Sequence, residues 1–134
     1  MIYLDQSRST LRHAVQTGGT WDIVDIDRDP NEIGISSQFV INPKGERIYA
    51  HYNVRNQVLL TTAPAASRKF TTKVVATAGG VWQVSLGMRW SASGTLLLSF
   101  ANWNISSGSL VVARSDDLQT IVGSFVADAE NVAG

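Results

Sequence analysis

The sequence predicts an all-β fold of four-stranded antiparallel blades, with about three blades in the chain. Apolar residues alternate with polar ones in short runs rich in valine, isoleucine, threonine and aromatic side chains, as in half-buried strands. Clusters of glycine, serine, asparagine and proline separate these runs. One strand pattern occurs three times at a nearly fixed interval, which is how propeller blades appear in a sequence.

The expected strands follow this alternation in chain order. They are short, and no long segment has the period of an amphipathic helix. The strands are expected at residues 2–4, 11–14, 21–24, 39–42, 47–52, 58–63, 70–75, 88–90, 95–101, 110–113 and 120–123. Turn clusters are found at 18–19, 42–45, 79–80, 91–94 and 106–108.

The repeat sets the expected blade boundaries. Residues 11–14 return as 60–63 and as 110–113, at offsets of 49 and 50 residues, and Gly45 returns as Gly94 at an offset of 49. Four strands in an interval of this length are typical of a propeller blade. We therefore expect a single domain, 1–134, with a partial first blade that lacks its inner strand, two whole blades and a closing tail. These segments are residues 1–28, 29–78, 79–128 and 129–134.

Composition fits one soluble domain. The chain has 134 residues, 44% hydrophobic and 16% charged, which is enough for one core and too short for two ordinary domains. Disordered, collagen-like and disulfide-rich classes are excluded, and the lack of cysteine leaves the compartment open. Apolar runs such as 96–98 are far shorter than the roughly 20 residues that span a bilayer, and 1–5 does not look like a signal peptide.

The charge balance limits the partners that we expect. Eleven Lys and Arg residues against eleven Asp and Glu residues give a formal net charge of zero. Such a chain has no overall field to attract a phosphate backbone or an anionic lipid surface. We therefore expect no nucleic-acid partner and no membrane partner.

A family resemblance accompanies the repeat. Residues 2–21 resemble a blade of the sialidase-like, BNR-repeat β-propellers, and the similarity extends weakly over nearly the whole chain. The Asp box of that family, Ser-x-Asp-x-Gly-x-Thr-Trp, is echoed at 115–117, where Gln119, Ile121 and Val122 replace its Gly, Thr and Trp. Residues 115–118 equally resemble a turn of furanosidase-type propellers. The resemblance implies a ring of six blades.

The ring would be incomplete in one chain. At a period of 49 residues the chain holds about 2.7 blades, whereas propellers usually have four to eight. An open stack of three blades would leave apolar faces exposed. We therefore expect a homodimer that closes six blades, in which the 129–134 tail supplies the missing inner strand to the partner. The alternative is that the chain is a piece of a longer propeller.

Candidate ligand residues are sought in the loops after the second strand of each blade, at 5–9, 53–56 and 102–108. Trp103 could stack on a sugar ring while Asn102 and Asn104 bond its hydroxyl groups. The alternative is that Trp103 packs between blades and the asparagines cap a turn. The expected ligand-binding residues are Asn102, Trp103, Asn104, Asn53, Arg55, Asp5 and Arg89.

Metal, cofactor and catalytic sites have little support in the sequence. Asp25, Asp27 and Asp29 alternate as in a calcium loop, but Pro30 stands at the sixth position and Ser36 at the twelfth, so a charged strand edge is the better interpretation. Sialidase-like catalysis needs an arginine cluster, a Tyr–Glu pair and a general acid, and the chain has only three glutamates. We expect no metal, no cofactor and no assigned catalytic residue.

Three classes of function remain. We favour a noncatalytic, lectin-like propeller that binds carbohydrate as a self-assembled oligomer. A sialidase-like or furanosidase-like glycoside hydrolase is the second class, and it would need carboxylates that converge only in the assembled ring. A structural or interaction propeller is the third class.

Overall fold

A computed structural model describes residues 1–27, 36–53, 55–77, 86–103, 108–118 and 123–128. Within these ranges the chain forms eleven β-strands and no helix, so the all-β prediction is confirmed. The strands are β1 (Ile2–Asp5), β2 (Thr10–Thr17), β3 (Thr20–Asp27), β4 (Ser37–Ile41), β5 (Arg47–Tyr52), β6 (Gln57–Ala63), β7 (Thr71–Thr77), β8 (Leu86–Trp90), β9 (Leu96–Trp103), β10 (Gly108–Ser115) and β11 (Gly123–Asp128). The described ranges contain no helix that is long and apolar enough to cross a bilayer.

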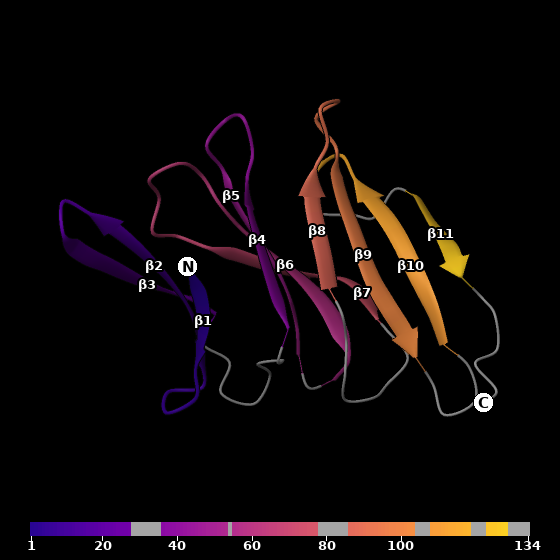
Figure 1. Ribbon diagram of the computed structural model, residues 1–134, viewed down its shortest axis with the longest axis horizontal. Coiled ribbons are helices and arrows are strands. Elements are labelled where there is room, and N and C mark those ends of the chain that lie inside the picture. The colour runs from indigo at the N-terminus through magenta and orange to yellow at the C-terminus, as the bar shows by residue number, and fades with distance from the viewer. Residues whose placement is uncertain (28–35, 54, 78–85, 104–107, 119–122, 129–134) are drawn as a thin grey trace.

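The strands form three antiparallel sheets that follow one another across the molecule (Figure 1). Sheet 1 has the order β1-β2-β3, sheet 2 the order β4-β5-β6-β7, and sheet 3 the order β8-β9-β10-β11. Within each sheet, the described strands pair with the strands next to them in the chain, as expected for a meander. β4 lies against β8 and β1 lies against β4, so the first strands of the sheets are neighbours.

Strand β5 shows why sheet 2 lies in the middle. Side chains alternate between the two faces of a strand. Ile48, Ala50 and Tyr52 belong to the apolar cluster shared with sheet 3, whereas Tyr49 belongs to the cluster shared with sheet 1. Both faces of β5 are therefore covered, and all five residues from 48 to 52 are buried. This is why the segment reads as an almost continuous apolar run.

The larger core fills the space between sheets 2 and 3. Its buried side chains are Ile48, Ala50, Tyr52, Val58, Leu60, Leu86, Leu96, Leu98, Phe100 and Ala113. The smaller core lies between sheets 1 and 2 and is built on Leu11, Ile26 and Tyr49, with Phe39 and Phe70 packed against it. We call the first the apolar junction and the second the polar junction, because the second also contains two buried histidines.

Two expected strands of the third sheet differ from those observed. β9 continues to Trp103 and β10 begins at Gly108, so the connection between them is shorter than the expected 102–108 loop. A strand was expected at 120–123, but β11 occupies Gly123–Asp128 and pairs with β10 from Arg114 onward. After β10, Leu118 adopts the left-handed region at a φ of 59°.

Candidate functional site

Most of the expected ligand residues lie at one edge of the three sheets. Asp5 is the last residue of β1, and Asn53 and Arg55 lie directly after β5. Asn102 and Trp103 are the last two residues of β9, where the backbone still pairs with β10. This is the lower edge in Figure 1, where β1, β5 and β9 lead into the next strands. The register therefore brings the three candidate loops to the same side of the molecule.

The other two expected residues are placed differently. Asn104 lies outside the described residues. Arg89 in β8 pairs with Leu97, six residues from Trp103 along β9. At about 3.3 Å per residue, this separation is about 20 Å. Arg89 is thus set apart from the residues at the lower edge.

Asn53 organises a turn. Its side chain is buried, with 4% of the residue exposed. Its Oδ1 accepts hydrogen bonds from the backbone N–H groups of Arg55 at 3.0 Å and Gln57 at 2.9 Å, and its Nδ2 donates to Gln57 Oε1 at 2.7 Å. These bonds satisfy both the acceptor and a donor of the amide, so the observed role of Asn53 is to shape the loop.

Asp5 forms bonds within its own sheet. Its carboxylate accepts hydrogen bonds from Ser7 Oγ at 2.7 Å and from Arg12 at 3.1 Å, and Arg8 lies 3.9 Å away. The hydrogen bond from Ser7, aided by Arg8 and Arg12, lowers the pKa of Asp5. The structure therefore shows Asp5 as a member of a charged cluster, and ligand binding by the lower edge stays a prediction.

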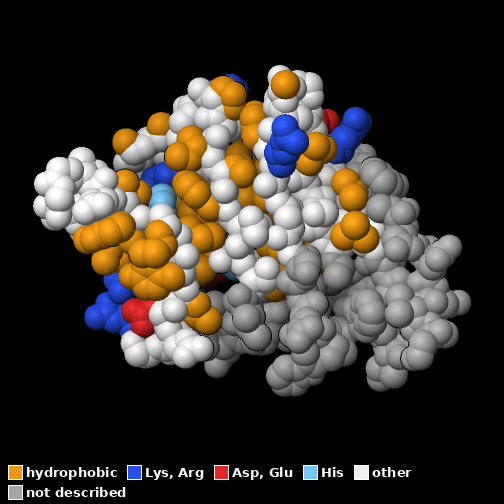
Figure 2. All heavy atoms as spheres, in the orientation of Figure 1, with side chains coloured by type: hydrophobic (Ala, Val, Ile, Leu, Met, Phe, Trp, Pro, Cys, Tyr) orange, Lys and Arg blue, Asp and Glu red, His pale blue; other side chains and the backbone are white. Residues whose placement is uncertain are grey.

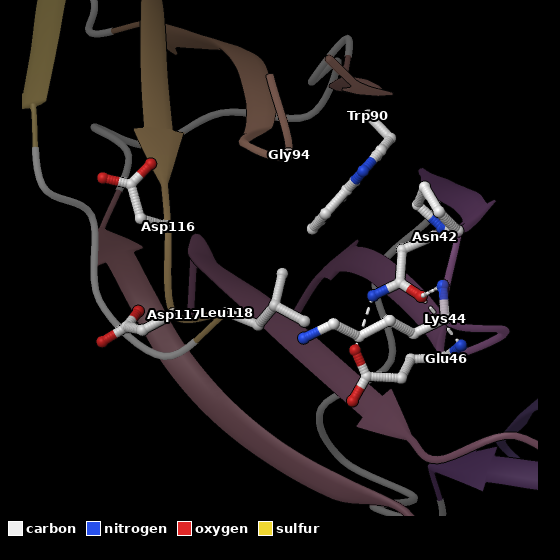
Figure 3. A pocket seen from close by; sticks show the side chains of 9 residues that line it. Asn42, Lys44, Glu46, Trp90, Gly94, Asp116, Asp117 and Leu118 are labelled. Atoms are coloured by element: carbon white, nitrogen blue, oxygen red, sulfur yellow. Dashed lines mark hydrogen bonds between the residues drawn. The ribbon is translucent and has the colours of Figure 1, made fainter. Parts of the chain in front are cut away.

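A cleft lies at the opposite edge, between sheets 2 and 3 (Figure 3). Its volume is about 520 Å³, within the range of small-ligand sites. It is lined by Asn42, Pro43, Lys44, Glu46, Trp90, Gly94, Asp116, Asp117 and Leu118. These residues come from the turns after β4, β8 and β10, and Trp90 is the last residue of β8 itself. Figure 3 shows the Trp90 indole between Asn42 on one side and Asp116 on the other.

Asn42 shapes one wall of the cleft. Its Oδ1 accepts hydrogen bonds from the backbone N–H groups of Lys44 at 3.0 Å and Glu46 at 2.9 Å, and its Nδ2 donates to Glu46 Oε2 at 2.5 Å. Gly45 adopts a φ of 77°, a conformation that favours glycine and closes the turn. The bonds leave the Lys44 side chain exposed at the rim, where it forms no ion pair with the residues that the structure describes.

The facing wall is built in a related way. Ser91 Oγ accepts the backbone N–H of Thr95 at 3.0 Å, and Gly94 takes a φ of 87°. Thr95 Oγ1 then donates to Asp116 Oδ1 at 3.0 Å. Asp116 is exposed and lines the cleft. This wall connects the turn after β8 to the residues that echo an Asp box.

Trp90 gives the cleft its aromatic surface. It is partly buried against the apolar junction, and its Nε1 is buried without a hydrogen-bond partner among the described residues. The lining combines this ring with the carboxylates of Glu46, Asp116 and Asp117 and the ammonium of Lys44. An aromatic face with acceptors and one donor around it suits a hydroxyl-rich ligand. Among the described residues, no group of three His, Cys, Asp or Glu side chains is placed to hold a metal.

The sequence indicated parts of this cleft but not the cleft itself. The turns at 42–45 and 91–94 match in the repeat, and 115–118 echoes the Asp box. Trp90, however, follows the period-two pattern of a covered strand face and therefore looks like an ordinary core residue. A tryptophan at the last position of an inner strand, directly before a glycine turn, was the available signal.

Comparisons of the chain with protein-family models, with curated proteins and with solved structures found no match.

Proposed function

We propose that this chain is a noncatalytic, lectin-like module that binds carbohydrate, and that two copies close a six-bladed β-propeller. The observation that carries the ligand proposal is the cleft around Trp90. The cleft is large enough for a small ligand, and it combines an aromatic side chain with surrounding carboxylate, amide and ammonium groups. A sugar needs such an aromatic surface for stacking and such polar groups for its hydroxyls. The succession of three meander sheets supports the propeller.

The roles of the lining residues follow from their chemistry. The Trp90 ring offers an apolar face on which the C–H groups of a sugar can stack. Asp116 and Glu46 accept hydrogen bonds from hydroxyl groups, and Lys44 donates one. Asn42 acts indirectly, because its side chain holds the turn that positions Lys44 and Glu46. The cleft thus replaces the Trp103 loop as the main candidate site.

The test is a glycan array followed by calorimetric titration of any glycan that binds. We expect Trp90→Ala to weaken binding by about 1 to 3 kcal/mol, as aromatic anchors commonly do. Because Trp90 also packs in the core, Lys44→Ala and Asp116→Asn serve as exposed variants that leave the packing intact. Trp103→Ala is the matched aromatic control at the opposite edge.

The outcomes separate the two edges. Loss of binding in the Lys44, Trp90 and Asp116 variants with normal binding in Trp103→Ala supports the cleft. The reverse pattern returns the site to the lower edge. No bound glycan on the array, or hydrolysis of a fluorogenic sialoside or arabinoside by the unaltered protein, overturns the proposal of a noncatalytic lectin.

A further inference from the structure

The outward face of sheet 1 is the face turned away from sheet 2. Its side chains alternate along β2 with Leu11 and His13, which face sheet 2. The register places Tyr3, Asp5, Arg12, Ala14, Trp21, Ile23 and Asp25 on the outward face. Trp21 and Ile23 are 50% and 40% exposed. Figure 2 shows hydrophobic side chains gathered over sheet 1 at the left of the view.

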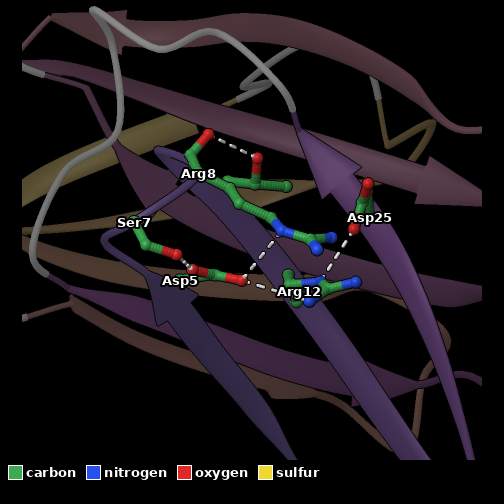
Figure 4. A network of polar contacts seen from close by, with 6 residues as sticks. Asp5, Ser7, Arg8, Arg12 and Asp25 are labelled. Carbon is green, nitrogen blue, oxygen red and sulfur yellow. Dashed lines mark hydrogen bonds and ion pairs between the residues drawn. The ribbon is translucent and has the colours of Figure 1, made fainter.

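An ion-pair row, formed by Asp5, Arg12 and Asp25, crosses this face (Figure 4). Arg12 Nε donates to Asp25 Oδ1 at 2.8 Å, and its NH1 donates to Asp5 Oδ2 at 3.1 Å. The three side chains come from three neighbouring strands. Asp25 pairs directly with Arg12, whereas Asp5 pairs with Thr10, two residues before Arg12 on β2. Two carboxylates thus flank one guanidinium on a sheet face that also exposes aromatic and aliphatic groups.

Sheet 2 carries a polar row at the corresponding positions. His51, Thr61 and Thr72 are joined by hydrogen bonds of 3.1 and 2.8 Å across β5, β6 and β7. Thr61 lies 49 residues after Arg12 and pairs with Thr72 as Arg12 pairs with Asp25. In sheet 2 this row lies at the junction with sheet 1, and both His51 and Thr61 are buried. The ion-pair row of sheet 1 therefore lies where a further sheet would pack.

The outward face of sheet 3 corresponds, by the repeat, to the face of sheet 2 that packs on the following sheet. Its residues alternate with Leu98 and the other core residues of β9, and on β8, β9 and β10 they include Gly87, Arg89, Leu97, Ser99, Leu110, Val112 and Arg114, with Asp128 of β11 paired to Leu110. Leu97 and Leu110 lie 49 and 50 residues after Ile48 and Leu60, which the neighbouring sheet buries almost completely. Leu97 and Leu110 are instead 37% and 42% exposed. This face thus has the positions of a sheet junction without a covering sheet among the described strands.

We infer that the outward face of sheet 3 in one copy packs on the outward face of sheet 1 in a second copy, with Arg89 and Arg114 facing the ion-pair row. The inference rests on the dimer proposed above and adds the surfaces and charges that form it. A twofold axis makes the contact twice, so that both outward faces are covered in both copies. The exposed apolar side chains supply the burial that drives association.

Charge complementarity identifies a second copy as the occupant. The ion-pair row of sheet 1 has two carboxylates and one guanidinium, whereas the outward face of sheet 3 has two exposed guanidiniums, Arg89 and Arg114, and one carboxylate position, Asp128, which pairs with Leu110. Pairing sheet 1 with sheet 1 or sheet 3 with sheet 3 would bring like charges together. Opposed charges therefore select the head-to-tail pairing, while the apolar groups provide most of the affinity.

The test uses two charge variants that are complementary to each other. Arg114→Glu reverses a charge on sheet 3, and Ile23→Arg adds a positive charge to sheet 1 without removing a member of the ion-pair row. Each variant alone places like charges at both contacts of a homodimer. In an equimolar mixture, one contact joins Glu at 114 to Arg at 23, and the other contact joins two unaltered faces. Lys44→Glu, a charge reversal in the cleft, is the matched control.

Sedimentation equilibrium measures the outcome. We expect the unaltered chain and the control to have twice the 14.5 kDa mass of one chain, and each face variant to dissociate about tenfold or more readily. The mixture should recover the doubled mass. If both variants stay dimeric with normal melting temperatures, the inference is wrong but the dimer stands. If the unaltered chain is a folded monomer, both are wrong, whereas glycan binding by that monomer would leave the ligand proposal intact.

Discussion

The two junctions of sheet 2 are built from different chemistry, although they lie on opposite faces of the same strands. The apolar junction with sheet 3 is mainly aliphatic, with Ile48 and Leu60 from sheet 2 packed against Leu96 and Leu98. The polar junction with sheet 1 buries His13, whose ring lies 4.7 Å from that of Phe39 between centroids. The hydrophobic effect does not depend on the orientation of the apolar groups, whereas buried polar groups need hydrogen-bond partners in a defined geometry.

The polar junction depends on particular pairs. Tyr49 Oη lies 2.8 Å from His13 Nδ1, and the two groups share a hydrogen bond. His51 Nε2 lies 3.1 Å from Thr61 Oγ1 and 3.5 Å from the Asp27 carboxylate. Sheet 3 is therefore held mainly by buried apolar area, and sheet 1 mainly by specific contacts. The two junctions should therefore respond differently to substitution and to pH.

The largest effect is expected from a cavity in the apolar junction. Leu98→Ala should lower the free energy of unfolding by about 2 to 5 kcal/mol, because the side chain is almost fully buried and leaves a void. Urea denaturation measures the change, at a fixed protein concentration because association contributes to stability. Val74→Ala, at a residue that is 49% exposed on β7, is the control and should change stability little. Equal losses in both variants would contradict the packing described for this junction.

The next effect compares two tyrosines of one strand. Tyr49→Phe removes the partner of His13 in the polar junction and should cost about 1 to 3 kcal/mol. Tyr52→Phe removes a buried hydroxyl that has no hydrogen-bond partner among the described residues, so it should be neutral or stabilising. Thermal and urea unfolding of the two variants measure the difference. The contrast between the junctions is lost if Tyr52→Phe is the more damaging of the pair.

Acidification should weaken the polar junction first. Burial lowers the pKa of both His13 and His51 below 6.5, although Asp27 opposes the shift at His51. The unfolded chain therefore binds more protons than the folded chain as the pH falls through 6.5, and stability decreases on the acid side. The slope is at most about 1.4 kcal/mol per pH unit for each histidine. Urea midpoints between neutral and mildly acidic pH measure it, and histidine NMR signals that titrate normally in the folded state would contradict it.

The smallest effect is expected at the exposed rim of the polar junction. Arg68 pairs with Asp22 there, and both side chains are more than half exposed. Exposed ion pairs contribute little, so Arg68→Ala should change stability by less than about 1 kcal/mol. The loss should shrink further in concentrated salt because the charges are screened. A larger, salt-independent loss would mean that the Arg68 side chain contributes through packing.

The local sequence pattern was sufficient to predict most strands, because each sheet is a meander of strands that follow one another in the chain. The period-two alternation placed β5 and β6 correctly, and the repeat of Gly45 as Gly94 identified the turns that became the walls of the cleft. The limits of the third sheet could not be predicted, because the end of β9 at Trp103 is set by pairing with β10 and not by its own residues. Strand ends depend on such partners.

The site was harder to predict because its residues have local roles as well. Asn53 looked like a ligand residue since amides bind sugars, yet in the structure its amide bonds are used to close a turn. Trp90 looked like a core residue, yet it reaches the cleft where two turns separate. Whether a polar group remains available for a ligand depends on three-dimensional neighbours, and a single sequence contains no direct record of them.

The meander order also has a kinetic consequence. Since each described strand pairs only with strands next to it in the chain, every sheet can close through short hairpin loops at a small entropic cost. Each sheet can then form as soon as its own strands are available, before contacts between sheets exist. The central sheet would meanwhile expose both faces, including the histidine-bearing face of β5 and β6. Partially folded chains should therefore be most prone to aggregate after sheet 2 has formed and before sheets 1 and 3 have docked on it.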